Sequence, residues 1–291
     1  MLYYKLKSYL FHRNNRIFAG FRDRMKSEYL FSSVDSYDTP ANTRVSRLFR
    51  LMLGSRWYFY GVNFGIFIRC GICASKGKLK KNEQIYYSNG NFRLVERCGA
   101  KIHLRGLDNL RAVQNEPVVL IGNHMSLLET AVFHSIAREY VDFGFIIKES
   151  LERVPFFRHI VKALGSVAVS RTNPREDLKA VLTRGKSVLQ NGRSIIVFPQ
   201  STRSEVFDPE KFNTIGIKLA KSAGVKVVPF ALKTDFLACG KYLKDLGPVH
   251  PEKDVYFEFA EPLTITGNGQ EQHQQIIDFI SSRLEQWKQE K

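Results

Sequence analysis

The sequence predicts an α/β fold in which helices flank a mixed, mostly parallel sheet. An N-terminal amphipathic helical region precedes this domain in the sequence. Three observations support this prediction. From about residue 95, short apolar runs alternate with helical stretches, as in proteins built from βαβ units. Hydrophobic residues make up 44% of the 291 residues, which is enough for one large domain with an appendage. The first 60 residues carry a net charge of +7, which sets them apart from the rest of the chain.

Apolar runs mark the expected strands, and a polar or helix-breaking residue stops each of them. The runs cover residues 101–104, 117–122, 143–148, 166–170, 194–198, 225–232 and 255–259. Helical periodicity places helices at 127–140, 156–164, 173–192, on the segment that ends at 224, and at 272–287. The helix after residue 173 has Asn173 as its cap, Pro174 in its first turn and Gly192 at its end. Residues 76–291 are therefore expected to form the α/β domain.

Residues 1–75 are expected to form basic amphipathic helices. Around residue 50, apolar side chains fall on one helix face and arginines fall opposite: Val45, Leu48, Phe49, Met52 and Leu53 against Arg44, Arg47 and Arg50. An earlier segment repeats the pattern, with Ile17, Phe18, Phe21 and Met25 on one face and Arg16, Arg22 and Arg24 interspersed. The apolar run 57–68 would rise only about 18 Å as a helix, which is too short for a hydrocarbon core of roughly 30 Å.

The charge of the chain limits its partners. The net charge of +16 and the pI of about 9.7 favour a polyanion: a nucleic acid, an anionic membrane surface or a phosphate-bearing substrate. No zinc-finger, RNP-type or helix-turn-helix motif accompanies the charge, so no nucleic acid is expected. We expect the N-terminal region to dock on an anionic bilayer with its apolar side down. The alternative is that its helices pack on the domain and leave their arginines in solvent.

Other features narrow the class of protein. A mean hydropathy of −0.23 argues against a multispanning membrane protein, and no secretory signal is expected. Four cysteines in a chain of this length do not form a disulfide scaffold. Cys70 and Cys73 are expected to be reduced apolar thiols, since their segment lacks the strand-to-helix context of a redox motif.

A histidine followed five positions later by an acid is the first candidate for acid–base chemistry, because a carboxylate can orient an imidazole. Chance predicts about 0.7 such pairs here. The sequence contains four: His103/Asp108, His124/Glu129, His134/Glu139 and His273/Asp278. The last two lie inside predicted helices, where five positions turn by about 140° and the side chains diverge. His134 and His273 are therefore expected at the surface, and His103 in a strand.

His124 has a different context. It follows the apolar run 117–122 at the carboxyl end of the expected strand, where open α/β sheets place their ligands. Ser126 is placed to cap the next helix, and Glu129 falls in its first turn. A strand–turn–helix bend can bring such a pair together. The alternative is a partly buried histidine beside a capping acid.

The loop 198–204 also follows an apolar strand at its carboxyl end. If this strand neighbours that of His124, both loops face one crevice. Arg203 could then pair with a phosphate through two parallel hydrogen bonds. The alternative is an ordinary solvated arginine.

Several blocks in order resemble the glycerolipid acyltransferase family, typified by 1-acyl-glycerol-3-phosphate acyltransferase. They are residues 123–129 (NHMSLLE), 148–151 with 155–157, 165–171, 198–204 (FPQSTRS) and 228–231, while 106–110 resembles the family's G-L-E-N-L lead-in. The resemblance covers roughly residues 95–262.

The resemblance implies an O-acyltransferase that moves a fatty acyl group from a thioester, on coenzyme A or acyl carrier protein, to a lysolipid hydroxyl in phospholipid biosynthesis or remodelling. It implies no metal or prosthetic group. His124 Nε2 would act as the general base, and Glu129 would accept from His124 Nδ1–H. The acceptor's phosphate or other anionic head would lie against residues of two blocks: Arg171, Gln200, Ser201, Thr202 and Arg203. The enzyme would be peripheral or monotopic on the cytoplasmic face of a membrane.

The sequence departs from the family pattern at four positions. Glu129 replaces an Asp, Gln200 a Glu and Ser201 a Gly, and Ser170 stands where Asp is frequent. Gln200 keeps the hydrogen-bonding capacity but loses the charge, and Ser201 lacks the backbone freedom of glycine. The acceptor could therefore be another lysophospholipid or an amino-acid-containing lysolipid instead of lysophosphatidic acid. The alternative function is a catalytically weakened relative that binds a lipid or a protein.

Overall fold

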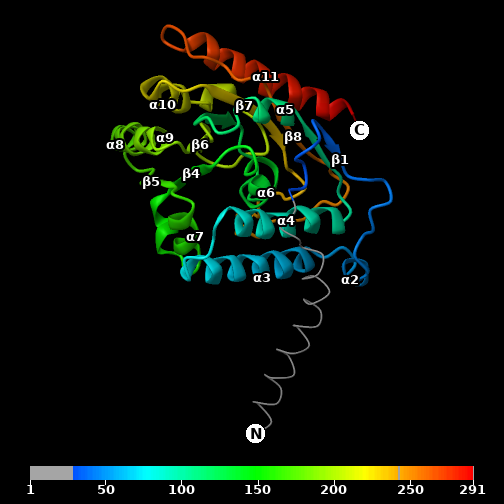
Figure 1. The fold of residues 1–291 in the computed structure, drawn as a ribbon. Helices are drawn as coiled ribbons and strands as arrows, with labels where there is room; N and C mark the ends of the chain where they lie inside the picture. The colour runs from blue at the N-terminus through cyan, green and yellow to red at the C-terminus, as the bar shows by residue number, and fades with distance from the viewer. Residues whose placement is uncertain (1–28, 242, 291) are drawn as a thin grey trace.

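A computed structural model describes residues 29–241 and 243–290 (Figure 1). Its centre is an eight-stranded sheet with the order β1-β2-β8-β7-β3-β6-β4-β5. The strands are β1 Tyr37–Asp38, β2 Ile102–Arg105, β3 Val119–Gly122, β4 Phe143–Lys148, β5 Val167–Val169, β6 Ser194–Val197, β7 Val227–Lys233 and β8 Val255–Phe259. The five strands from β7 to β5 are parallel. Strand β8 is antiparallel to β7, and β1 is antiparallel to β2. The predicted mixed, mostly parallel sheet is confirmed.

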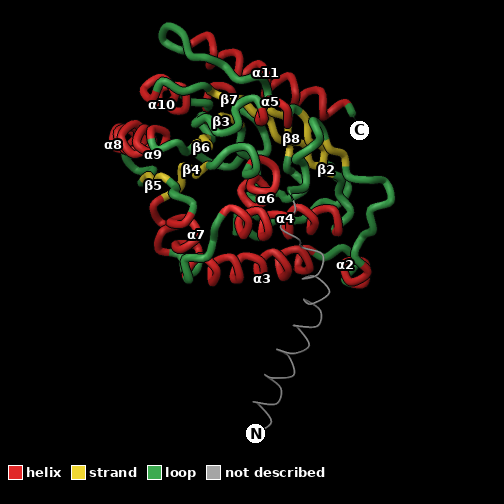
Figure 2. Tube along the Cα trace, viewed as in Figure 1, coloured by secondary structure: helices red, strands yellow, loops and turns green. Residues whose placement is uncertain are grey.

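Helices cover both faces of this sheet (Figures 1 and 2). Those described are α2 Arg47–Leu51, α3 Arg56–Ser75, α4 Lys81–Arg97, α5 Leu107–Arg111, α6 Leu128–Ala137, α7 Phe157–Ala163, α8 Pro174–Ala180, α9 Lys186–Gln190, α10 Ile215–Ala223 and α11 Gln270–Gln289. Helices α10 and α11 lie against one face, and α6, α4 and α3 are stacked in that order on the other. The predicted helix 173–192 forms with Asn173 as its cap, but a π-helical turn, Val181–Gly185, divides it.

Helix α6 is enclosed between the sheet and α4. Its Phe133 contacts five aromatic rings of the sheet: Phe143, Phe145, Phe230, Phe257 and Phe259. The prediction that His134 lies at the surface is wrong. Helix α4 covers the outer side of α6, and the centroid of the His134 ring lies 4.6 Å from that of Phe143. His273 is half-buried against Phe212 rather than fully exposed.

Helix α4 has no counterpart among the sequence predictions. Its buried residues include four polar ones, Gln84, Ser88, Asn89 and Asn91, among apolar ones. Two of these side chains bond to α6: Ser88 Oγ donates to Ala131 O at 2.8 Å, and Ser135 Oγ donates to Asn89. Polar residues thus interrupt the apolar pattern of the buried face, so a pattern search does not find this helix.

The N-terminal region is partly described. The expected segment around residues 17–25 lies outside the described residues. Around residue 50, the regular helix α2 is shorter than the amphipathic face that the sequence predicts. Helix α3 contains the apolar run 57–68 and continues past Arg69 to Ser75, so it has 20 residues in all. None of the described helices is long and apolar enough to cross a membrane. The inner side of α3 joins the core, where the Phe59 ring lies 5.7 Å from Phe236. The division at residue 75 stays a prediction.

Candidate active site

Two loops meet at the carboxyl edge of the parallel sheet. Strand β3 lies between β6 and β7, so the loops that follow these strands are neighbours. The His124 N–H donates to Gln200 Oε1 at 2.9 Å, and the Ser204 N–H donates to His124 O at 2.9 Å. The His124 ring stacks on Phe198 with 4.2 Å between the centroids. The two predicted loops are therefore in direct contact at this edge of the sheet.

Glu129 is fully buried beside His124. Its Oε1 accepts hydrogen bonds from the N–H groups of Met125 and Ser126 at 2.5 and 2.7 Å. The same oxygen lies 3.7 Å from His124 Nδ1, which is ion-pair range but longer than a hydrogen bond. Among the described residues, Nδ1 has no hydrogen-bond partner. The carboxylate thus fixes the loop that carries His124 and places negative charge beside its ring.

Hydrogen bonds to the β7 backbone and to Thr234, which follows β7, hold this loop against the sheet. Asn123 completes the ladder between β3 and β7: its Nδ2 donates to Leu232 O at 2.8 Å, and the Leu232 N–H donates to its Oδ1 at 2.9 Å. Ser126 Oγ accepts from the Leu128 N–H at 3.1 Å and bonds Thr234 Oγ1 at 3.0 Å. The residue at the cap position of α6 is Leu127, so the predicted cap at Ser126 lies one position too early. The supporting role of Asn123 and Thr234 was not predicted, since it depends on a strand about 110 positions away.

The histidine at 103 has a different partner from the one its spacing suggests. Its Nδ1 lies 2.5 Å from Asp38 Oδ1, on the edge strand β1, and its Nε2 lies 3.6 Å from Asp254. His103 therefore belongs to a surface ion-pair group far along the sheet from the crevice.

The 198–204 loop presents its polar residues in different directions. Gln200 is buried and supports the His124 amide, while Ser201 and Thr202 are exposed. Ser201 has a φ of 61°, so the position that holds glycine in the family pattern is left-handed here. Ser201 therefore adopts a backbone conformation that glycine reaches without strain.

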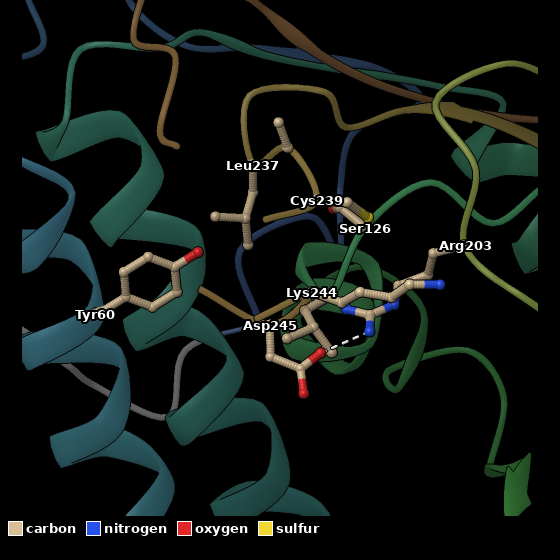
Figure 3. A pocket seen from close by; sticks show the side chains of 9 residues that line it. Tyr60, Ser126, Arg203, Leu237, Cys239, Lys244 and Asp245 are labelled. Atoms are coloured by element: carbon tan, nitrogen blue, oxygen red, sulfur yellow. Dashed lines mark hydrogen bonds and ion pairs between the residues drawn. The ribbon is translucent and has the colours of Figure 1, made fainter. Parts of the chain in front are cut away.

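Arg203 lines a small pocket, here called the Arg203 cavity, beside the His124 loop (Figure 3). Its Nη2 is 2.5 Å from Asp245 Oδ1, and Asp245 is itself exposed. Tyr60 reaches this cavity from α3, and its hydroxyl donates to Gly247 O at 3.0 Å. Burial raises the pKa of Tyr60 to about 12, so its hydroxyl stays protonated. Neither Tyr60 nor Asp245 was predicted, because neither carries a local motif.

Arg171 contributes a second guanidinium near the same edge. It follows β5 with a φ of 61°, and Asp177 accepts its N–H at 2.8 Å. Burial lowers the pKa of Arg171, Asp177 opposes this, and the Arg203 charge lowers it further. The effect of Arg203 on this pKa means that the two guanidiniums repel each other. Within residues 29–241 and 243–290, no group of three or more His, Cys, Asp or Glu side chains could hold a metal ion.

The domain that carries this site matches a known family. Residues 101–233 match the family model described as Acyltransferase. The chain contains an acyltransferase domain. The predicted resemblance to the glycerolipid acyltransferases is confirmed.

Three proteins illustrate the similarity. The 1-acyl-sn-glycerol-3-phosphate acyltransferases of Pseudomonas aeruginosa and Borreliella burgdorferi are each 31% identical, over 134 and 136 residues. These matches cover 46% of this chain and 50% and 52% of the relatives, so the chain spans about half the length of the curated relatives it matches. The crystal structure of the LPA acyltransferase PlsC from Thermotoga maritima has the same fold, with a TM-score of 0.61 and 20% identity over 84% of this chain and 98% of that one.

The acyltransferase domain begins one residue before β2 and ends with β7. It therefore includes the strands that carry His124, Arg171 and Arg203. Helices α2 to α4 precede it, and β8 and α11 follow it. Tyr60 and Asp245, which border the Arg203 cavity, come from outside the matched region.

Proposed function

We propose that this protein is a membrane-associated O-acyltransferase that moves a fatty acyl group from an acyl thioester to the hydroxyl of a lysolipid. The first acceptor to consider is 1-acyl-sn-glycerol-3-phosphate, on which the named relatives act. The observation that carries the proposal is the placement of His124 beside buried Glu129, with Arg203 on the adjoining loop.

His124 acts as the general base of the transfer. Its Nδ1 faces Glu129, which leaves Nε2 for the substrate. Nε2 takes the proton of the acceptor hydroxyl while that oxygen attacks the thioester carbonyl. The tetrahedral intermediate then collapses, the C–S bond breaks, and the imidazolium returns the proton to the leaving sulfur. The products are the acylated lipid and the free thiol.

Glu129 supports this proton transfer through its charge. It has no access to water, and two backbone N–H groups already hold its Oε1. The negative charge stabilises the imidazolium that forms during attack. The 3.7 Å separation shortens to a hydrogen bond when substrate fills the crevice, as catalytic contacts often do on binding.

Arg203 and Arg171 bind the anionic head of the acceptor. Asp245 forms an ion pair with Arg203 when no acceptor is bound, and the acceptor phosphate replaces this carboxylate as the partner of Arg203. Gln200 supports the His124 loop, and Ser201 and Thr202 lie at the mouth of the site and offer hydroxyl groups to the same head.

The N-terminal helices place the enzyme on an anionic bilayer. The outward side of α3 is apolar and exposed: Trp57 is 56% and Phe64 61% exposed, while Leu53 before it is 95% exposed. Four exposed arginines lie just before or at the start of α3: Arg44, Arg47, Arg50 and Arg56. Apolar insertion together with attraction to anionic lipid is how interfacial helices bind. The proposed location is the cytoplasmic face, where acyl-CoA and acyl carrier protein are present.

Purified protein offered labelled acyl-CoA or acyl-carrier-protein with a panel of lysolipids tests this proposal, with the product identified by mass. Transfer to lysophosphatidate, to another lysophospholipid or to an amino-acid-containing lysolipid would settle the acceptor. His124→Ala should lower the rate by about 10²–10⁴-fold, which is the range of a general base. Full activity in this variant would refute the assignment.

His273→Ala is the matched control, because His273 has the same spacing to an acid but lies on α11, away from the crevice. It should leave the rate unchanged. If the unaltered protein is inactive and Gln200→Glu with Ser201→Gly gains activity, the protein is instead the weakened relative that binds a lipid or a protein.

A further inference from the structure

A second cleft lies at the opposite edge of the sheet from His124. It has a volume of about 610 Å³ and opens between the end of α3, the start of α4, and α7. Arg138 at the end of α6, Asp142 before β4, and Arg193 before β6 form its floor. The proposed acyl transfer uses none of these residues.

The cleft is strongly basic. Five cationic side chains line it: Lys80, Lys81, Arg138, Lys162 and Arg193. Asp142 is its single acidic residue, and it contacts both Arg138 and Arg193 at 3.0 Å. One carboxylate thus faces two guanidiniums, and the cleft keeps an excess of positive charge. The amino terminus of α4, a helix of 17 residues, adds partial positive charge.

The floor of this cleft is rigidly built. Arg138 is only 8% exposed, and its Nε donates to Gln84 Oε1 at 2.7 Å. Arg193 donates to Leu164 O at 2.7 Å, while its Nε is buried and has no partner among the described residues. Burial lowers the pKa of Arg138, and the nearby Arg193 charge opposes protonation further. Asp142 offsets part of this repulsion, but its single negative charge is shared by two guanidiniums.

We infer that this cleft binds a phosphate-bearing anion, separate from the acyl acceptor. A buried and a partly buried arginine held in fixed orientation suit phosphate oxygens, and the lysines at the rim supply further charge. The ligand is either a free phosphate compound or the phosphate of an anionic lipid.

The surroundings favour the lipid phosphate, and this choice rests on the proposed membrane association. Ile72 on α3 and Val154 and Phe156 before α7 are exposed apolar residues. Gly71 of α3 lies directly against Phe156, so the two apolar segments are continuous. Ser75 and Ala163, at the ends of the same helices, line the cleft. A lipid with its chains at this apolar surface would present its head group to the arginines.

The test compares the unaltered protein with a variant carrying Lys80→Gln and Lys162→Gln, both exposed rim residues. Calorimetry measures the binding of inorganic pyrophosphate. Flotation measures binding to phosphatidylcholine vesicles and to vesicles of equal parts phosphatidylcholine and phosphatidylglycerol. The variant should bind the anionic probe about tenfold more weakly, since each lysine contributes to phosphate attraction. A loss with anionic vesicles identifies a lipid phosphate, and a loss with pyrophosphate alone identifies a soluble one.

The control variant carries Lys218→Gln and Lys221→Gln on α10, which removes equal charge from the other side of the sheet. Equal binding by the two variants would overturn the inference. Acyl transfer in detergent separates the two proposals: the cleft variant should transfer at the unaltered rate. Inactivity of the unaltered protein would count against the proposed function alone, because the binding arms need no transfer.

Discussion

The two edges of the parallel sheet both gather positive charge, but they present it differently. At the carboxyl edge, Arg171 and Arg203 lie on loops, and the carboxylate that meets Arg203 comes from the exposed Asp245. At the amino edge, Arg138 and Arg193 are fixed at the ends of regular elements and share the single Asp142.

This difference shows what separates a chemical site from a binding site. The carboxyl edge combines its cations with His124 and buried Glu129, and two of its residues adopt left-handed backbone conformations, Arg171 and Ser201. His159 lines the cleft at the other edge, but its Nε2 accepts a hydrogen bond from Arg158 Nε at 3.2 Å, whereas His124 faces a buried carboxylate. Charge and a histidine are present at both edges, and the pairing of the histidine with buried Glu129 is what distinguishes the carboxyl edge.

Removing the Glu129 carboxylate should have the largest effect at the carboxyl edge. Glu129→Ala leaves the N–H groups of Met125 and Ser126 unpaired in the interior, so the free energy of unfolding should fall by about 3 kcal/mol. Urea unfolding measures it. Glu129→Gln keeps an oxygen acceptor, so it should recover most of the stability but not the activity. A Glu129→Gln variant with full activity would show that the charge is not needed.

Arg203 should affect acceptor binding more than turnover. Arg203→Ala removes a guanidinium from the proposed phosphate site, so KM for the acceptor should rise by about 10- to 100-fold with a smaller change in kcat. Asp245→Asn should lower KM instead, because the competing carboxylate is lost. Steady-state kinetics distinguish these outcomes. Arg175→Ala, on the exposed first turn of α8, is the control and should change neither constant.

His134 should make the free energy of unfolding depend on pH in the acid range. Burial, with the Arg138 and Arg193 charges, lowers its pKa to about 3 from an ordinary 6.5. Below pH 6.5 the unfolded chain therefore binds a proton that the folded chain does not. The free energy of unfolding should fall by about 1.4 kcal/mol per pH unit from 6.5 towards 3 on this account.

Unfolding in urea at pH 7 and pH 5 tests this prediction with His134→Phe, which keeps an aromatic ring among Phe143 and Phe145. The variant should lose about 2 kcal/mol less than the unaltered protein over this interval. His159→Phe on α7 is the control. Parallel losses in all three proteins would show that His134 does not titrate on unfolding.

Ser201 should give the smallest effect. Its φ of 61° strains a residue with a side chain, so Ser201→Gly should raise the free energy of unfolding by about 0.5–1 kcal/mol. Ser187→Gly in α9 should do the opposite, because a helix interior disfavours glycine. Thermal unfolding compares the two. A destabilised Ser201→Gly would mean that the Ser201 hydroxyl supports the loop.

Local patterns predicted most of the strands and the positions of both active-site loops. The run 143–148 matches β4, because a buried strand needs continuous apolar residues. Patterns failed where polar residues interrupt the buried face, as in α4, and where a second layer covers a helix, as at His134. The proximity of Arg203 to Asp245 could not be predicted either, since no spacing rule connects positions 42 apart.

The sequence alone therefore determined most of the strands, the helices that have an apolar pattern, and the turn that carries His124. Each of these depends on residues within a few positions of one another. Only the tertiary structure decided which acid meets His103, that Gln200 supports the His124 amide from 76 positions away, and that Arg138 and Arg193 share Asp142. Strand order and helix layering bring these groups together, and neither is encoded in a short stretch of sequence.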